Sequence, residues 1–195
     1  METNIQCTDP AVSRLKYFKE LETFQVLQND WRNKGVFLVH ADFPIMEFLF
    51  TAPKLKPSSV VFAIRVDFTN FDTEPLSVRC IDPFNRSVIT RKEVPIHFIL
   101  AVQKTVNGQV QFQQQDLLQG PADEIPFFCF KGTREYHENP AHTGDSWFLY
   151  RGNSGIGTLN HILDTLYNYG LLPVGGYNVN LQPQITFQQQ FKAQV

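Results

Sequence analysis

The chain has 195 residues, 43% of them hydrophobic and 18% charged, and its net charge is −2 from 17 basic and 19 acidic residues. This composition predicts a globular protein with one sizeable core and excludes a disordered chain. A balanced charge without a basic run or stripe argues against nucleic-acid binding. No apolar run has the length of a membrane span, and the polar start METNIQCTDP lacks a secretory apolar region, so we expect a cytoplasmic protein without a membrane partner.

The first predicted element is a helix over AVSRLKYFKELETFQVLQNDW, residues 11–31. Asp9-Pro10 before it supplies an N-cap acceptor and a proline at the first helical position. Apolar residues recur at three-residue steps, which indicates an amphipathic surface helix: Val12, Leu15, Phe18, Leu21, Phe24 and Leu27.

Four short segments rich in β-branched and aromatic residues follow, at 35–42, 45–52, 60–68 and 75–81. Their short connections predict an antiparallel meander. In the third segment, Phe62, Ile64, Val66 and Phe68 alternate and share one face. Two further segments, 94–103 and 109–118, bracket Asn107-Gly108, which is a strong hairpin turn signal.

The C-terminal part contains the Pro-flanked run IPFFCF (125–130) and a second predicted helix, TLNHILDTLYNYG (158–170). Leu159, Ile162, Leu163 and Leu166 form its apolar face, and Gly170 is the expected stop. The order of elements predicts an α+β protein with a single domain over residues 1–170. A Gln-rich tail over 171–195 has room for one added strand, and the tetrapeptide FQQQ occurs both there and at 112–115.

The segment CFKGTREYHENPAH (129–142) concentrates the reactive groups of the chain. Cys129, Glu135, His137 and His142 are ligand types that Zn²⁺ accepts, with Glu138 as a substitute for Glu135. Alternatively, Cys129 is a nucleophile whose proton is taken by His137 or His142. The third interpretation is a solvated polar loop behind a buried strand cysteine. Close by, Asp145 either accepts a hydrogen bond from a ligand histidine or is a turn residue, and Trp147 is a core anchor.

Residues 10–170 resemble the ubiquitin-conjugating (E2) fold in the order of their elements. The stretch VVFAIRVDFTNFDTEPLSVRCIDPF is similar to the E2 strand, acidic-aromatic turn and following strand, and TLNHILDTLYNYGLL is similar to its later helix. On that alignment Cys129 falls at the thioester cysteine, while LLQGPADEIPFF replaces the His-Pro-Asn tripeptide of the family. The resemblance implies that the protein takes a ubiquitin-like protein from an E1-like enzyme and passes it to an amine.

A second, local resemblance covers FCFKGTREYHENPAHTGDSWFLYRG. This stretch resembles a bacterial family predicted to bind metal through a Cys-Glu-His-His signature and found in gene neighbourhoods with E1-like, JAB-type protease and ubiquitin-like proteins. The matching residues are Cys129, Glu135, His137 and His142. The resemblance implies a role in bacterial ubiquitin-like conjugation, with antiphage defence as its setting.

The leading hypothesis is therefore an E2-like protein that carries a ubiquitin-like protein on Cys129 and needs no cofactor. His137 and His142 tune the thiol or deprotonate the amine, and Glu135 orients a histidine. The alternative is a non-catalytic accessory protein that binds zinc through these same four residues. A third class is an adaptor domain without site chemistry. The sequence does not name the protein target.

Overall fold

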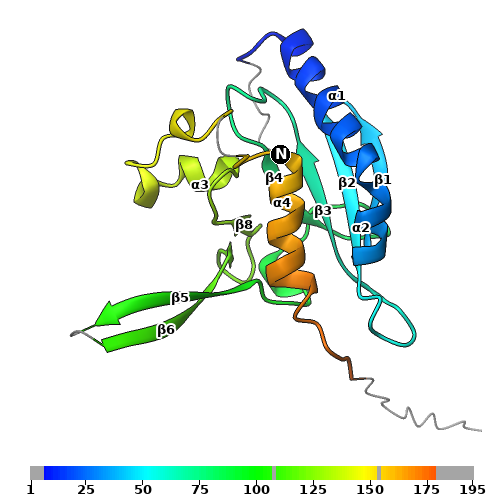
Figure 1. Ribbon diagram of the computed structural model, residues 1–195, viewed down its shortest axis with the longest axis vertical. Helices are drawn as coiled ribbons and strands as arrows, with labels where there is room; N and C mark the ends of the chain where they lie inside the picture. Colours follow the sequence, from blue (N-terminus) through cyan, green and yellow to red (C-terminus); the bar gives the residue numbers. More distant parts are fainter. Residues whose placement is uncertain (1–6, 107–108, 153–154, 179–195) are drawn as a thin grey trace, which may run out of the picture.

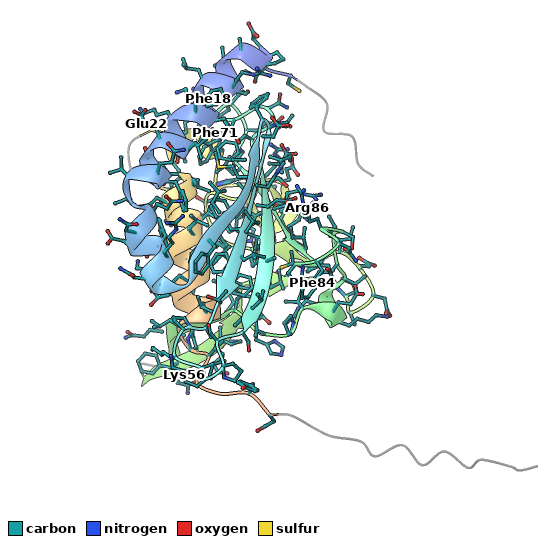
Figure 2. All side chains as sticks on the ribbon, turned by 90° about the vertical axis from the view of Figure 1, so that its right-hand side faces the viewer. Phe18, Glu22, Lys56, Phe71, Phe84 and Arg86 are labelled. Atoms are coloured by element: carbon teal, nitrogen blue, oxygen red, sulfur yellow. The ribbon has the colours of Figure 1, made fainter. Side chains whose placement is uncertain are left out.

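In the computed structural model, which describes residues 7–106, 109–152 and 155–178, the chain folds around a four-stranded antiparallel sheet. Figure 1 shows α1 (Pro10–Val26) and α4 (Leu159–Leu166) against this sheet, and Figure 2, turned by 90°, shows both helices on the same face. The predicted α+β class is confirmed. None of the described helices is long and apolar enough to cross a membrane.

The sheet has the predicted meander topology. Its strands pair antiparallel in sequence order: β1 (Val36–Asp42), β2 (Ile45–Thr51), β3 (Val60–Asp67) and β4 (Ser77–Ile81). The predicted alternation in the third strand is also confirmed, because Phe62, Ile64, Val66 and Phe68 are at most 4% exposed. These side chains are part of the sheet's contribution to the core beneath the helices.

The N-terminal helix begins as predicted, but it ends at Val26, before the predicted end at residue 31. Asp9 caps it, since its Oδ1 accepts from the N–H of Ala11 at 2.9 Å. The helix is interrupted at Leu27, and α2 (Gln28–Lys34) continues to a left-handed cap at Gly35, whose φ is 88°.

The buried face of α1 differs from the predicted one. Tyr17 and Phe24 face the core with Ser13, whereas Leu15 is 71% exposed. Residues three apart lie about 60° apart around a helix, so a stripe at constant three-residue steps winds around it. The observed spacings of four and seven residues keep one face. The outward-facing apolar residues of the predicted stripe are Val12, Leu15 and Phe18.

Two hairpins follow the sheet and the short helical turn η1 (Arg91–Glu93). The pairing of β5 (Ile99–Val106) with β6 (Gln109–Asp116) confirms the predicted hairpin, although its Asn107-Gly108 turn lies outside the described residues. The second hairpin joins β7 (Leu118–Gln119) to β8 (Phe127–Phe128). Three short helices follow within residues 129–149, which we call the reactive segment. They are α3 (Arg134–Glu138), η2 (Pro140–His142) and η3 (Trp147–Leu149).

The second long helix has the predicted apolar face, since Leu159, Ile162, Leu163 and Leu166 are at most 1% exposed. Gly170 does not end it. The chain continues through a π-helical turn, η4 (Tyr167–Leu171), in which a Cβ on Gly170 would lie 2.3 Å from the Phe98 ring. Gly170 is therefore suited to close packing rather than to a helix stop. Residues 179–195, where the added strand was expected, lie outside the described residues.

Candidate functional site

Cys129 lies directly after β8 and is held there by its backbone. Its N–H donates to the Leu117 carbonyl at 2.7 Å, and the Thr133 hydroxyl donates to the Phe128 carbonyl at 2.8 Å. The residue is 5% exposed. Burial raises the pKa of the Cys129 thiol, so the thiol form is favoured unless a base takes its proton.

The His142 imidazole lies within reach of this thiol. Its Nε2 lies 3.4 Å from Cys129 Sγ, within the range of a hydrogen bond to sulfur. The His142 ring stacks on the ring of Tyr136 with centroids 4.0 Å apart and an interplanar angle of 22°. Asn139 caps the η2 turn that carries His142, because its Oδ1 accepts from the Ala141 N–H at 2.9 Å. The imidazole is thus fixed from the ring face and from the backbone.

His137 takes a different orientation. Its Nδ1 donates to the Asp145 carbonyl at 2.7 Å, which leaves Nε2 to accept from the Gly132 N–H at 3.2 Å. Burial lowers the pKa of His137, which favours this neutral form. The structure therefore brings Cys129 together with His142, while Nε2 of His137 is directed at a backbone amide.

Asp145 joins the aromatic residues around the site. Its carboxylate accepts from the hydroxyls of Tyr136, at 2.6 Å, and Tyr150, and it pairs with Lys131 at 3.2 Å. The Tyr136 hydrogen bond, followed by that of Tyr150, lowers the pKa of Asp145 to about 2. Asp145 is thus a charged acceptor, and its backbone carbonyl also orients His137.

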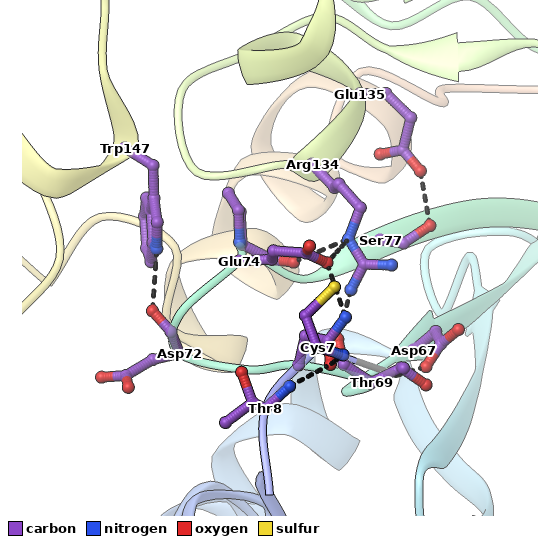
Figure 3. Close-up of polar contacts among 12 residues, drawn as sticks. Cys7, Thr8, Asp67, Thr69, Asp72, Glu74, Ser77, Arg134, Glu135 and Trp147 are labelled. Carbon is purple, nitrogen blue, oxygen red and sulfur yellow. Dashed lines mark hydrogen bonds and ion pairs between the residues drawn. The ribbon is translucent and has the colours of Figure 1, made fainter. Parts of the chain in front are cut away.

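Glu135 lies on the other side of α3, against β4. Figure 3 shows its carboxylate reaching Ser77, whose hydroxyl donates to Oε1 at 2.5 Å. Arg79 lies 3.4 Å from the same oxygen, and the residue is buried. Its carboxylate is therefore satisfied by β4 rather than by a histidine. Glu138, its possible substitute, is exposed at the end of α3.

Arg134, which precedes Glu135, fixes the same short helix to the loop before β4. Its Nε donates to the Pro75 carbonyl at 3.2 Å and its Nη2 to the Thr69 carbonyl at 2.5 Å, while the Glu74 carboxylate lies 3.6 Å away (Figure 3). The Arg134 N–H also donates to the Leu76 carbonyl at 2.8 Å. These contacts dock the reactive segment onto the sheet.

Trp147 completes this docking, as its predicted role of core anchor requires. It is buried, and its Nε1 donates to the Asp72 carbonyl at 2.9 Å (Figure 3). Gly157 packs directly on its ring, because a Cβ there would lie 2.5 Å from Cη2. Gly157 is therefore suited to close packing against the indole.

Of the four expected metal ligands, Cys129 and His142 lie at a separation that suits a shared zinc ion. A tetrahedral zinc ion, with Zn–S about 2.3 Å and Zn–N about 2.0 Å, holds adjacent sulfur and nitrogen ligands about 3.5 Å apart. The separation of Cys129 Sγ and His142 Nε2 matches this value. Glu135 and His137 are engaged elsewhere, and the described part of the chain contains no group of three or more potential ligands.

Tyr136 and Arg134 are site residues that the sequence interpretation did not identify. Tyr136 sits one position before His137 and six before His142, so its stacking partner depends on the fold of the loop. An aromatic residue between two potential histidine bases was the available signal. The run Gly-Thr-Arg-Glu gave no comparable sign that its two charged residues anchor α3 to the sheet.

Comparisons with known proteins place these residues within a shared sequence. Residues 8–174 match the Y4jH family, described as Y4jH-like. The uncharacterized protein y4jH of Sinorhizobium fredii (strain NBRC 101917 / NGR234) is 39% identical over 188 residues, which cover 91% of each chain. The match therefore spans both the sheet and the reactive segment.

Proposed function

The chain belongs to the Y4jH-like family, and from its paired thiol and imidazole we propose that it is an E2-like component of a bacterial ubiquitin-like conjugation system. It carries a ubiquitin-like protein as a thioester on Cys129 and transfers it to an amine of a target protein. The observation that carries the proposal is the 3.4 Å separation of Cys129 Sγ and His142 Nε2. The likeness of the element order to an E2 protein supports it.

The chemistry has two steps. In the first, His142 takes the Cys129 proton, and the thiolate attacks the carbonyl carbon of the thioester between the ubiquitin-like protein and an E1-like enzyme. A new C–S bond forms, and the cysteine thiolate of the E1-like enzyme leaves and takes the proton from His142, which returns the imidazole to its neutral form. In the second step an amine attacks the new thioester, the amine proton passes to His142, and the Cys129 thiolate leaves.

The other site residues act through this pair. Tyr136 holds the His142 ring from its face, and Asp145 holds the Tyr136 hydroxyl. Glu135 fixes α3 to β4 through Ser77, which is a positioning role at a distance from the thiol. His137 braces the loop between Gly132 and Asp145.

The test is adduct formation with an E1-like enzyme, a ubiquitin-like protein from the same gene neighbourhood, and ATP. We expect a thiol-sensitive adduct with the wild-type chain and none with Cys129→Ser. The matched control is Cys7→Ser, which removes an exposed cysteine and should leave the adduct unchanged. Failure of the wild-type chain to form an adduct with a demonstrably charged E1-like enzyme would overturn the proposal.

A second candidate function is zinc binding by an accessory protein of the same system. The thiol–imidazole separation favours it, because it matches the distance between adjacent sulfur and nitrogen ligands of a tetrahedral zinc ion. Cys129 and His142 would hold the ion, which would occupy the thiol and block covalent chemistry. Elemental analysis of chain purified without chelators should then give about one zinc per chain, lost in both Cys129→Ser and His142→Gln. A metal-free wild-type chain would exclude this candidate.

A further inference from the structure

A groove of about 260 Å³ lies between the end of α2, the loop after β2 and the η4 turn with the residues that follow it. Figure 1 shows these elements at the end of the molecule where the described chain leaves, so we call this groove the end groove. All of its lining residues lie outside the reactive segment. The end groove is therefore a site separate from Cys129.

The floor of the end groove is apolar. Ala52 and Leu171 line it and are each 3% exposed, and the half-buried Val174 beside them packs against the same core. Such a surface favours a hydrocarbon group that displaces water from it. Since a cavity of about 150 Å³ holds benzene, a volume of about 260 Å³ accommodates a ligand of about ten non-hydrogen atoms.

Hydrogen bonds hold the walls of the end groove in place. In the loop after β2, the Leu55 N–H and the Ser58 hydroxyl donate to the Ala52 carbonyl at 3.1 and 3.2 Å. The Tyr177 hydroxyl donates to the Lys56 carbonyl at 3.3 Å, which ties the departing chain to the same loop, and Figure 2 shows Lys56 at this end of the molecule. A groove that is formed before its ligand arrives needs little ordering on binding.

The charged residues that line the end groove are two lysines, and in the part of the chain that the structure describes no carboxylate lines it. The Lys34 ammonium lies 4.6 Å from the ring centroid of Trp31 and 5.0 Å from that of Tyr167, which fix its position. It pairs with Asp164 at 3.4 Å, but the Asp164 side chain is 53% exposed, so this pair is weak and the ammonium can bind a second anion. Lys54 is exposed on the loop after β2.

An apolar floor beneath two ammonium groups fits an amphipathic anion. We propose that the end groove binds a medium-chain monocarboxylate. Its hydrocarbon tail lies against Ala52 and Leu171, and its carboxylate pairs with Lys34 and Lys54. Octanoate, with about ten non-hydrogen atoms, matches the volume of the end groove. A neutral compound of the same length lacks the charge that the two lysines select.

An NMR titration of the full-length chain with octanoate tests this proposal, with the methyl resonances of Ala52, Leu171 and Val174 as reporters. These resonances should shift saturably. Octan-1-ol has a tail of the same length and is the more hydrophobic compound, so it would bind more tightly if burial of the tail alone decided affinity. We expect octanoate to bind at least about fivefold more tightly than octan-1-ol, because each exposed charge pair adds a modest contribution.

The substitution Lys54→Gln removes one of the two charges and keeps a polar side chain. It should weaken octanoate binding at least about threefold and leave octan-1-ol binding within about twofold of the wild type. Lys56→Gln is the matched control, because Lys56 is exposed in the same loop and its side chain does not line the end groove. In this variant the affinity for octanoate should stay within about twofold of the wild type.

Any of four results would overturn the proposal. The groove methyls could show no saturable shift, octan-1-ol could bind as tightly as octanoate, or Lys54→Gln and Lys56→Gln could weaken octanoate binding equally. In the absence of octanoate, methyl resonances that depend on protein concentration would show that a second copy of the chain covers the end groove. The adduct and zinc assays do not bear on these outcomes, because the end groove and the Cys129 site are tested separately.

Discussion

At the scale of single residues, the site depends on which partner each polar side chain has. His142 faces the thiol because Tyr136 supports its ring, and Tyr136 is held in turn by the Asp145 carboxylate. His137, five positions earlier, is hydrogen-bonded to two backbone groups, the Gly132 N–H and the Asp145 carbonyl. The sequence offers His137 and His142 as alternative bases, but only the His142 ring lies within hydrogen-bond distance of the Cys129 thiol.

The substitution His142→Gln tests this assignment. The His142 imidazole is the ring within hydrogen-bond distance of the Cys129 thiol, so its removal leaves this buried thiol without that base. A buried thiol without a base supplies less of the reactive thiolate at neutral pH. We expect alkylation of Cys129 by iodoacetamide at pH 7 to slow about tenfold and the pH–rate curve to move upward, as measured by mass spectrometry of the Cys129 peptide.

The control for this prediction is Glu135→Gln. It weakens a buried hydrogen-bonded pair with Ser77 and should lower the free energy of unfolding by about 1–3 kcal/mol. Because Glu135 lies on the β4 side of α3, the alkylation rate should stay within about twofold of the wild type. Equal slowing in both variants would contradict the separate roles of His142 and Glu135.

At the scale of elements, the strands could be predicted well and the faces of α1 could not. Strand segments are bounded by turn residues, and alternation such as that from Phe62 to Phe68 leaves one choice of buried face. In α1, apolar residues occur on several sides, and Tyr17 and Phe24 are buried because they meet β2 and the loops beside it. That choice depends on tertiary packing, which periodicity alone does not contain.

The short helix α3 shows the same limit within the candidate site. The sequence identified Cys129, Glu135, His137 and His142 as the chemically distinctive residues, and all four lie on or beside α3 and η2. The partners of Glu135 are contributed by β4, nearly sixty residues earlier in the chain. A local motif therefore predicts which residues are present in a site, whereas long-range pairing decides which of them face one another.

At the scale of the whole molecule, α4 joins the sheet, the N-terminal helices and the reactive segment. The Leu159 N–H donates to Glu20 on α1 at 3.0 Å, and the Trp31 indole of α2 donates to Asn160 at 3.1 Å. His161 lies beside Phe130, with ring centroids 6.3 Å apart. Because these contacts come from successive residues of one helix, loosening α4 should loosen the core and the site together.

The substitution Leu163→Ala tests this coupling, with Leu15→Ala as its matched control. Leu163 is fully buried, so its truncation should lower the free energy of unfolding by about 2–5 kcal/mol. Leu15 is 71% exposed on α1, and its truncation should change that free energy by no more than about 0.5 kcal/mol. Denaturant unfolding followed by circular dichroism and by Cys129 alkylation should give coincident transitions in both variants, as one cooperative unit requires. Cys129 becoming reactive well before the loss of secondary structure would show instead that the reactive segment opens independently of α4.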